Sequence, residues 1–345
     1  MSIEDGGRLE GGPLGGGARV LVTGGSGRIG RHLIDELKSR NIGIRALTSK
    51  PLTEAQASDR TVEWVQHDFQ ASLDLDRHVA GCAAVLHLAG EVWDIPKMQR
   101  VNVEATAALA QAAERSGVTF FGYTSSVAVY GSSIDACVTE ETPVLTADHD
   151  VRAEYRGNAS IRTYGRTKLL AERALAAVAR RVEYVVFRPT VVVDLPDILA
   201  LAKRSRVEHR ILGRRHEHHI YVKDVVHAML WFMDRALRHP EPMPGIEVFN
   251  LSDDEAEHRT SDAFLAQAFR QTGDPRFRLP VAGPIWVYDL FDLLKNKMLS
   301  RRQPLGKMLF SPAKLYATGY RHKFGMTAAQ KLSLDTLKKL DNPAE

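Results

Sequence analysis

Apolar residues along this chain alternate between short continuous runs and runs with helical spacing. One helical pattern places Ile29, Leu33 and Leu37 on a single face, and two more span Val101–Ser116 and Tyr164–Ala179. The short runs, rich in β-forming residues, are Arg19–Thr23, Ile42–Leu47, Val62–Val65, Ala83–Leu88, Phe120–Thr124 and Tyr184–Phe187. Strands that alternate with helices are typical of βαβ units, so the pattern predicts a parallel sheet with about six strands before residue 190.

Beyond Pro189 the pattern changes. Leu195–Lys203 has helical spacing, and Arg204–His219 is basic and rich in histidine. The strand and helix pattern then returns, with strands predicted at Ile220–Val222 and Glu247–Leu251 and a helix at Val225–Arg235. The segment from Glu255 to Leu340 predicts helices and short loops that cover the carboxyl edge of the sheet.

Composition limits the class of protein further. A chain of 345 residues with 44% hydrophobic content can bury a substantial core. A net charge of +4 requires no nucleic-acid partner. Only Cys82 and Cys137 are present, which is typical of a reducing compartment, and neither a signal peptide nor a membrane-spanning run is visible. We therefore expect a cytoplasmic protein with free thiols and no transmembrane segment.

A glycine-rich turn joins the first predicted strand to the first helix. Gly24, Gly27 and Gly30 lie in the run TGGSGRIG. Glycine suits this turn because a side chain would keep a pyrophosphate away from the backbone N–H groups and from the positive end of the helix. The strand, turn and helix together predict a dinucleotide site.

A second feature, YGRTK, places Tyr164 and Lys168 four residues apart on one helix face. An ammonium beside a phenol, helped by the positive ring of a cofactor, lowers the phenol's pKa and makes it a usable acid and base. Upstream, Ser125 and Ser126 follow a predicted strand at the same sheet edge and offer hydroxyls to a substrate oxygen. This arrangement predicts acid–base catalysis.

These motifs resemble those of the extended short-chain dehydrogenase/reductase family, also called the NAD-dependent epimerase/dehydratase family. The resemblance runs from Val20 to about Leu251 and includes VLHLAG, TSSVAVYG, FRPTVVV, IYVKDV and FNLS. It implies an α/β fold, with a Rossmann-type doubly wound parallel sheet over 18–194 and 220–252. It also implies a smaller, discontinuous C-terminal substrate domain over 195–219 and 253–345. Residues 1–17, which are rich in glycine and have no apolar periodicity, are expected to form a flexible leader.

The resemblance also implies residue roles. Ser126 would orient the substrate oxygen, Tyr164 would act as catalytic acid and base, and Lys168 would bind the nicotinamide ribose and tune Tyr164. A helix-mediated homodimer is usual for the family. The residues expected to contact the cofactor are Gly24, Gly27, Arg28, Ile29, Gly30, Ser49, Lys50, Asp68, Phe69, Leu88, Ala89 and Gly90, with Tyr164 and Lys168.

Two departures from the family pattern narrow the expected chemistry. Thr124, Ser125 and Ser126 stand where the sugar dehydratases carry an Asp/Glu acid–base pair, which argues against dehydration. The second strand and its end carry Arg45, Ser49 and Lys50, whose cations and hydroxyl suit a 2′-phosphate, and lack the acid that NAD-preferring members use for the ribose. NADP is therefore favoured, with NAD possible.

Two segments allow more than one interpretation. Arg214 and Arg215 lie in a basic, His-rich run that suits contact with a substrate diphosphate or an ordinary solvated loop, and we expect no metal there. The run Leu279–Lys297, which includes Trp286, is amphipathic and suits the roof of an apolar pocket or a membrane surface.

The combined pattern predicts an oxidoreductase that interconverts a ketone and a secondary alcohol on a small molecule, by preference a nucleotide-linked sugar. Alternatives are an enzyme resembling 3β-hydroxysteroid dehydrogenases or dihydroflavonol reductases with an apolar substrate, and a nucleotide-sugar epimerase. A non-catalytic dinucleotide sensor is a further alternative, which the set of Ser126, Tyr164 and Lys168 disfavours because a sensor does not need it.

Overall fold

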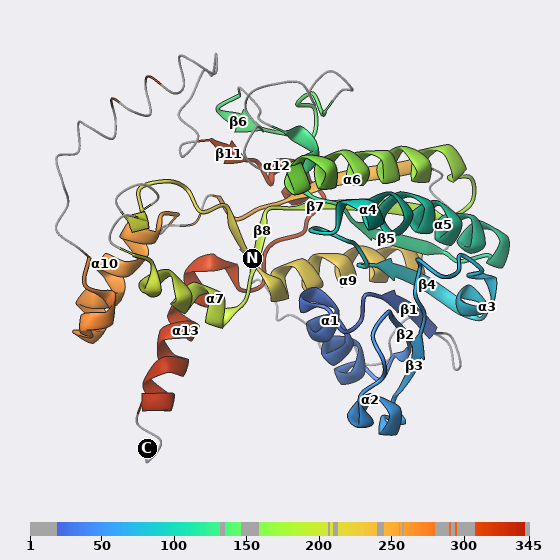
Figure 1. Cartoon of the computed structure of the whole chain (residues 1–345), viewed down its shortest axis with the longest axis horizontal. Coiled ribbons are helices and arrows are strands. Elements are labelled where there is room, and N and C mark those ends of the chain that lie inside the picture. The colour runs from blue at the N-terminus through green and yellow to red at the C-terminus, as the bar shows by residue number, and fades with distance from the viewer. Residues whose placement is uncertain are drawn as a thin grey trace, which may run out of the picture.

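The main body of the protein is a parallel sheet, as the sequence pattern predicts (Figure 1). The computed structural model describes residues 19–131, 135–145, 159–205, 208–209, 213–239, 245–254, 256, 259–279, 290, 294 and 308–341. Seven strands lie in the order β10-β7-β5-β4-β1-β2-β3, and all neighbouring pairs are parallel. Their bounds are β1 Arg19–Thr23, β2 Gly43–Thr48, β3 Val62–Gln66, β4 Cys82–His87, β5 Phe120–Thr124, β7 Glu183–Pro189 and β10 Gly245–Leu251.

Helices cover both faces of this sheet because successive strand residues point to opposite sides. Val20 and Val22 pack with α1 (Arg28–Ser39) and α9 (Val222–Arg238), whereas Leu21 packs in the core on the other face. The helices on that other face are α3 Asp76–Val79, α5 Ala105–Ser116 and α6 Ala159–Val178. The predicted α/β fold of Rossmann type is therefore confirmed.

The ends of several elements differ from those predicted. The α6 helix begins at Ala159 rather than Tyr164, and α9 begins at Val222 rather than Val225. The predicted helix over Val101–Ser116 consists of a π-helix, η1 (Gln99–Glu104), followed by α5. Apolar periodicity identifies the face that a helix buries, whereas its ends depend on local hydrogen bonds that periodicity does not report.

A second group of elements lies beside the sheet. Two short parallel strands, β8 and β9, form a separate sheet that packs with α7, α10 and α13 around its own apolar core. The bounds are β8 Val191–Val193, β9 His219–Tyr221, α7 Leu195–Ala200, η5 Leu201–Lys203, α10 Ser261–Thr272, η6 Pro275–Phe277 and α13 Gly325–Asp341. The remaining short elements are α2 Glu54–Ser58, α4 Ile95–Met98, η2 Val127–Tyr130, β6 Cys137–Val138, β11 Leu309–Phe310 and α12 Ala313–Ala317.

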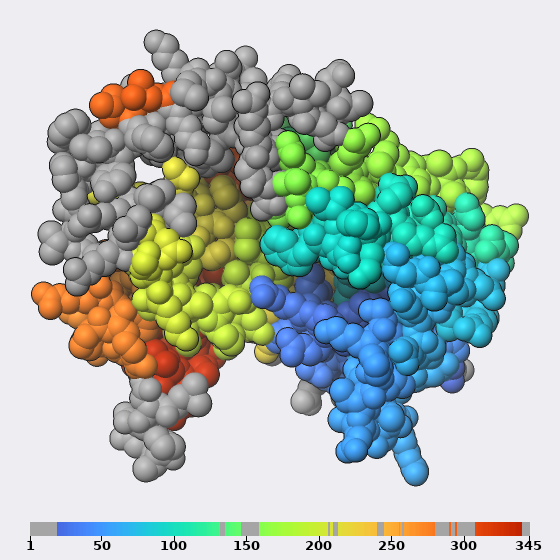
Figure 2. Space-filling model, in the orientation of Figure 1, coloured from blue at the N-terminus to red at the C-terminus, as the bar shows by residue number. Residues whose placement is uncertain are grey.

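Polar contacts join the two groups of elements. The Arg28 guanidinium donates to the Val192 carbonyl at 2.6 Å and pairs with Asp197 at 3.0 Å. His32 contacts Asp194 at 2.8 Å. In Figure 2 the yellow-green surface around α7 accordingly lies beside the blue surface of the first βα unit. The start of α1 is thus fastened to the segment that follows β7.

Two segments singled out in the sequence fall wholly or mainly outside the described residues. These are the glycine-rich leader at 1–17 and most of Leu279–Lys297, including Trp286. Within the described part of the chain, no helix combines the length and the apolar character that a membrane crossing requires.

Candidate active site

The three predicted catalytic residues come together at the carboxyl edge of the sheet. Ser126 lies two residues after the end of β5, and a hydrogen bond links its side chain to that of Tyr164 on α6. The Lys168 Nζ lies 5.7 Å from the centroid of the Tyr164 ring and donates to the Thr124 carbonyl at 2.8 Å. A hydroxyl, a phenol and an ammonium therefore share one site, as proton transfer at a substrate oxygen requires.

Burial determines the proton affinities of this group in the protein alone. It lowers the pKa of Lys168 to about 7, although the nearby Glu172 carboxylate acts in the opposite direction. Burial also raises the pKa of Tyr164 to about 12, opposed by the hydrogen bond with Ser126. The sequence-based expectation of a lowered phenol pKa included the positive ring of a cofactor. The protein by itself holds Tyr164 as a neutral proton donor.

The glycine turn leaves room for a phosphate group at the start of α1. A Cβ on Gly30 would lie 2.3 Å from the Gly24 carbonyl oxygen, and one on Gly24, whose φ is +70°, would lie 2.9 Å from the Ala89 nitrogen. Gly27 is the N-cap of α1 and offers no side chain to the first helical N–H groups. Those N–H groups can therefore donate hydrogen bonds to an anion, and the turn fits a dinucleotide pyrophosphate.

The loop after β4 lies between this turn and α6, the helix that carries Tyr164 and Lys168. A Cβ on Gly90 would lie 3.0 Å from the Lys168 Nζ. The Asn102 side chain accepts from the Glu91 N–H at 2.7 Å and donates to the Glu91 carbonyl at 2.9 Å and to the Thr167 hydroxyl at 3.0 Å. The end of the run Leu88, Ala89 and Gly90, the expected neighbours of the nicotinamide, thus lies next to α6.

A buried histidine supports the same loop. His87 contacts the Thr23 hydroxyl through Nδ1 at 2.6 Å and the Thr106 hydroxyl through Nε2 at 2.9 Å, and burial lowers its pKa to about 3. Thr106 donates to the Asn102 carbonyl, so the neutral ring donates from Nε2 and accepts at Nδ1. Thr23 in turn accepts from the Ala89 N–H at 3.2 Å.

Sequence reasoning did not assign these supporting residues to the site. His87 stands in VLHLAG and Arg188 in FRPTVVV, two runs that carry the family resemblance. Asn102 and Thr106 lie in the predicted helix over Val101–Ser116, and Glu172 lies four residues after YGRTK. Their position in those runs was the available signal. Their buried partners lie between 11 and 65 residues away along the chain, so the contacts themselves are not visible in the sequence.

The other expected cofactor residues follow β2 and β3 at the same edge. Ser49, Lys50 and Asp68 are exposed, and Phe69 is buried in the core. Arg45, whose charge also seemed suited to a 2′-phosphate, instead pairs with Glu63 at 2.9 Å and donates to backbone carbonyls that include that of His78. Arg28 is bound to Val192 and Asp197, as described above, and Ile29 packs against two of the apolar cores.

The two arginines expected at a substrate diphosphate lie beside α10. Arg214 is exposed and Arg215 is partly buried, next to the turn where the Asp262 N–H donates to the Gly213 carbonyl at 2.9 Å. Arg204 in the same basic run pairs with Glu217 at 2.5 Å. Among the described residues, no group of three or more His, Cys, Asp or Glu side chains is arranged to hold a metal ion.

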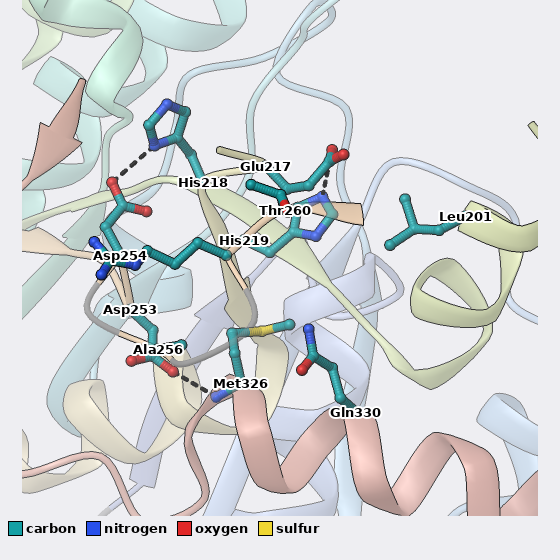
Figure 3. A pocket seen from close by; sticks show the side chains of 11 residues that line it. Leu201, Glu217, His218, His219, Asp253, Asp254, Ala256, Thr260, Met326 and Gln330 are labelled. Carbon is teal, nitrogen blue, oxygen red and sulfur yellow. Dashed lines mark hydrogen bonds and ion pairs between the residues drawn. The ribbon is translucent and has the colours of Figure 1, made fainter. Parts of the chain in front are cut away.

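A small polar pocket opens between β9, α13 and the segment after β10 (Figure 3). His218 contacts Asp254 at 2.7 Å, while His219 lies 3.8 Å from Glu217, so these adjacent histidines meet different acids. The described lining residues are Leu201, Glu217, His218, His219, Asp253, Asp254, Ala256, Arg259, Thr260, Met326 and Gln330. This pocket is formed without the predicted catalytic or cofactor residues.

Comparison with known proteins identifies the family. Residues 20–251 match the model of the NAD dependent epimerase/dehydratase family. The chain belongs to this family. As a member of the epimerase/dehydratase family, it is an enzyme with a dinucleotide cofactor.

Individual relatives of this epimerase/dehydratase chain have different substrates. It is 26% identical over 298 residues to UDP-glucose 4-epimerase of Vibrio cholerae, covering 81% of this chain and 82% of the relative. It is 24% identical over 302 residues to sterol demethylase protein B of Methylococcus capsulatus, covering 83% of this chain and 84% of that relative. A solved short-chain dehydrogenase/reductase superfamily protein of Agrobacterium tumefaciens with bound NAD has a TM-score of 0.69 at 23% identity, covering 94% and 98%.

Proposed function

We propose that this enzyme interconverts a ketone and a secondary alcohol by hydride transfer between a nicotinamide dinucleotide and the substrate carbon. The observation that supports this most strongly is the meeting of Ser126, Tyr164 and Lys168 at the sheet edge next to the glycine turn. When bound, the cofactor supplies or accepts the hydride. Tyr164 gives a proton to the substrate oxygen or removes one from it, while Ser126 orients that oxygen by a hydrogen bond.

A nucleotide-linked sugar is the substrate class that we propose first. The relative from Vibrio cholerae, a UDP-glucose 4-epimerase, supports it because the similarity extends over 81% of this chain. The experiment is to follow the absorbance of the reduced nicotinamide with a panel of nucleotide sugars and of 3-keto and 3-hydroxy sterols, with NAD(H) and NADP(H). A silent panel with both cofactors bound would count against hydride transfer.

An apolar substrate is a second candidate, because exposed apolar side chains follow the strands that carry the site. Trp93, after β4, is 70% exposed, and its carbonyl accepts from Ser160, one helical turn before Tyr164. Val191, after β7, is 53% exposed. Large exposed apolar groups at a site mouth favour an apolar ligand. The relative named sterol demethylase protein B agrees with this candidate.

Two sets of substitutions distinguish the candidates. Since a substrate diphosphate needs cations, Arg214→Ala/Arg215→Ala is expected to raise KM for a nucleotide sugar roughly tenfold or more. Trp93→Ala is expected to raise KM for a sterol by a similar factor, because apolar contact is lost. The control is Arg270→Ala/Arg278→Ala, which removes two exposed cations, one on α10 and one at the end of η6. Steady-state kinetics with the best substrate would reject the sugar if only Trp93→Ala has an effect.

We also propose a preference for NADP, which rests on Ser49 and Lys50 after β2. Both side chains are exposed there, and Thr48–Lys50 contains no acid to bind a ribose 2′-hydroxyl. NADPH is expected to bind more tightly than NADH. Ser49→Asp should reverse the order, because a carboxylate repels the 2′-phosphate and can accept from the ribose.

Fluorescence titration with each reduced cofactor measures this preference. Ser39→Asp is a matched control, since it adds the same charge on an exposed serine at the opposite end of α1 from the glycine turn. Equal affinities for NADPH and NADH in the unmodified protein would contradict the proposed preference.

A further inference from the structure

A buried ion pair lies directly behind the catalytic residues. Glu172 on α6 and Arg188 on β7 face each other with both side chains only 7% exposed. Arg188 donates from Nε to Glu172 Oε1 at 3.0 Å and from Nη2 to Oε2 at 2.6 Å. This two-point geometry fixes both side chains in orientation as well as in position.

The ion pair is tied to the segment that carries Ser126 on both sides of that residue. On one side, the Ser125 hydroxyl donates to Glu172 Oε1 at 2.5 Å. On the other, Arg188 Nη1 donates to the Tyr130 hydroxyl at 2.8 Å and its guanidinium lies 4.9 Å from the Tyr130 ring centroid. Tyr130 then donates to Asn250 on β10 at 2.7 Å.

The carboxylate of this ion pair also acts on the charge of Lys168. The Lys168 Nζ is buried, with the Tyr123 ring on β5 at 4.7 Å and the Tyr164 ring at 5.7 Å. His87 on β4 also interacts electrostatically with Lys168, and it is neutral. Glu172, one turn further along α6, is the opposing charge.

We propose that Glu172 and Arg188 are positioning residues, which hold the segment carrying Ser126 against Tyr164 and balance the charge of Lys168. Because this proposal concerns the same site, it rests on the proposed function. Arg188 partly cancels the Glu172 charge, so Lys168 sits next to a nearly neutral pair. That balance keeps the Lys168 pKa, which burial lowers to about 7, close to physiological pH.

Opposite changes to the two partners should shift the titration of Lys168 in opposite directions. Glu172→Gln removes the anion and leaves Arg188 unpaired, so the midpoint is expected to move to lower pH. Arg188→Gln leaves the Glu172 carboxylate unpaired, so the midpoint is expected to move to higher pH. The double variant, which removes both charges, should return it towards that of the unmodified chain. A purely structural role would not produce opposite signs.

The measurement is an NMR titration of the full chain labelled with ¹³C at the lysine Cε, in which Lys168→Arg identifies the Lys168 signal. The control is Glu183→Gln, which breaks a partly buried pair with Arg235 at the other end of β7, where Glu183 and Arg235 lie 2.7 Å apart. It should leave the midpoint unchanged. Should Arg188→Gln fail to fold, the lowered midpoint of Glu172→Gln and its return towards the unmodified value in the double variant still test the proposal.

Hydrogen–deuterium exchange tests the positioning role. Exchange of backbone amides in 125–131 is expected to rise roughly tenfold or more in Glu172→Gln and to stay unchanged in Glu183→Gln. The proposal would be overturned if the Lys168 midpoint moved in the same direction in both single variants or did not move in either of them. Unchanged exchange in 125–131 would also overturn it. Neither measurement uses a substrate or a cofactor, so a silent substrate panel would contradict the proposed function and leave this result intact.

Discussion

Replacing Tyr164 by phenylalanine is expected to lower turnover by about 10²-fold or more, while dinucleotide binding survives. The change removes only the hydroxyl that bonds to Ser126 and that is proposed to exchange a proton with the substrate oxygen. A loss of this size corresponds to about 2.7 kcal/mol of transition-state stabilisation. Steady-state kinetics with the best substrate of the panel, together with fluorescence titration of the reduced cofactor, measures both quantities.

A second buried tyrosine provides the matched control. The Tyr184 hydroxyl contacts Glu114 at 3.1 Å near the amino end of β7, away from the catalytic edge. Tyr184→Phe is expected to lower the free energy of unfolding by about 1 kcal/mol and to leave turnover unchanged. Undiminished turnover in Tyr164→Phe would show that Tyr164 is not the acid and base.

Gly30→Ala is expected to weaken dinucleotide binding by about 10²-fold or more and to lower the melting temperature. The added Cβ would lie 2.3 Å from the Gly24 carbonyl oxygen and 2.8 Å from the Gly25 Cα, and these backbone atoms can move only if the turn changes shape. Because the turn brings N–H groups to the pyrophosphate, its displacement removes several hydrogen bonds at once. Calorimetric titration and thermal unfolding give the two values.

The control for Gly30→Ala is Gly273→Ala. Gly273 ends α10 with φ of +67°, and a Cβ there would meet no atom within 4 Å. Alanine at this position is expected to cost about 1 kcal/mol of backbone strain without affecting dinucleotide binding. If both variants bind the dinucleotide as well as the unmodified chain, the glycine turn is not the pyrophosphate site.

Local sequence was sufficient to predict the sheet and the edge at which Ser126, Tyr164 and Lys168 lie. Apolar runs predicted the six strands of the seven-stranded sheet that precede residue 190, and the run Glu247–Leu251 predicted the seventh. The reason is that side chains alternate between the two faces of a strand and return to the same face of a helix about every 3.6 residues, so buried positions have a regular spacing in the sequence. The glycine turn and the spacing of Tyr164 and Lys168 are likewise short-range features, which the chain carries within a few residues.

The environment of the proposed catalytic groups was decided by the tertiary structure. The sequence indicated that the charge of Arg45 suits a phosphate, but in the structure its guanidinium pairs with Glu63 and donates to several backbone carbonyls. The guanidinium of Arg28 likewise donates to the segment after β7. The approach of Arg188 to Glu172 depends on β7 lying next to β5 beneath α6. The pattern of apolar residues predicts which side chains are buried. The partner of each buried charge, however, depends on which strands are neighbours in the sheet.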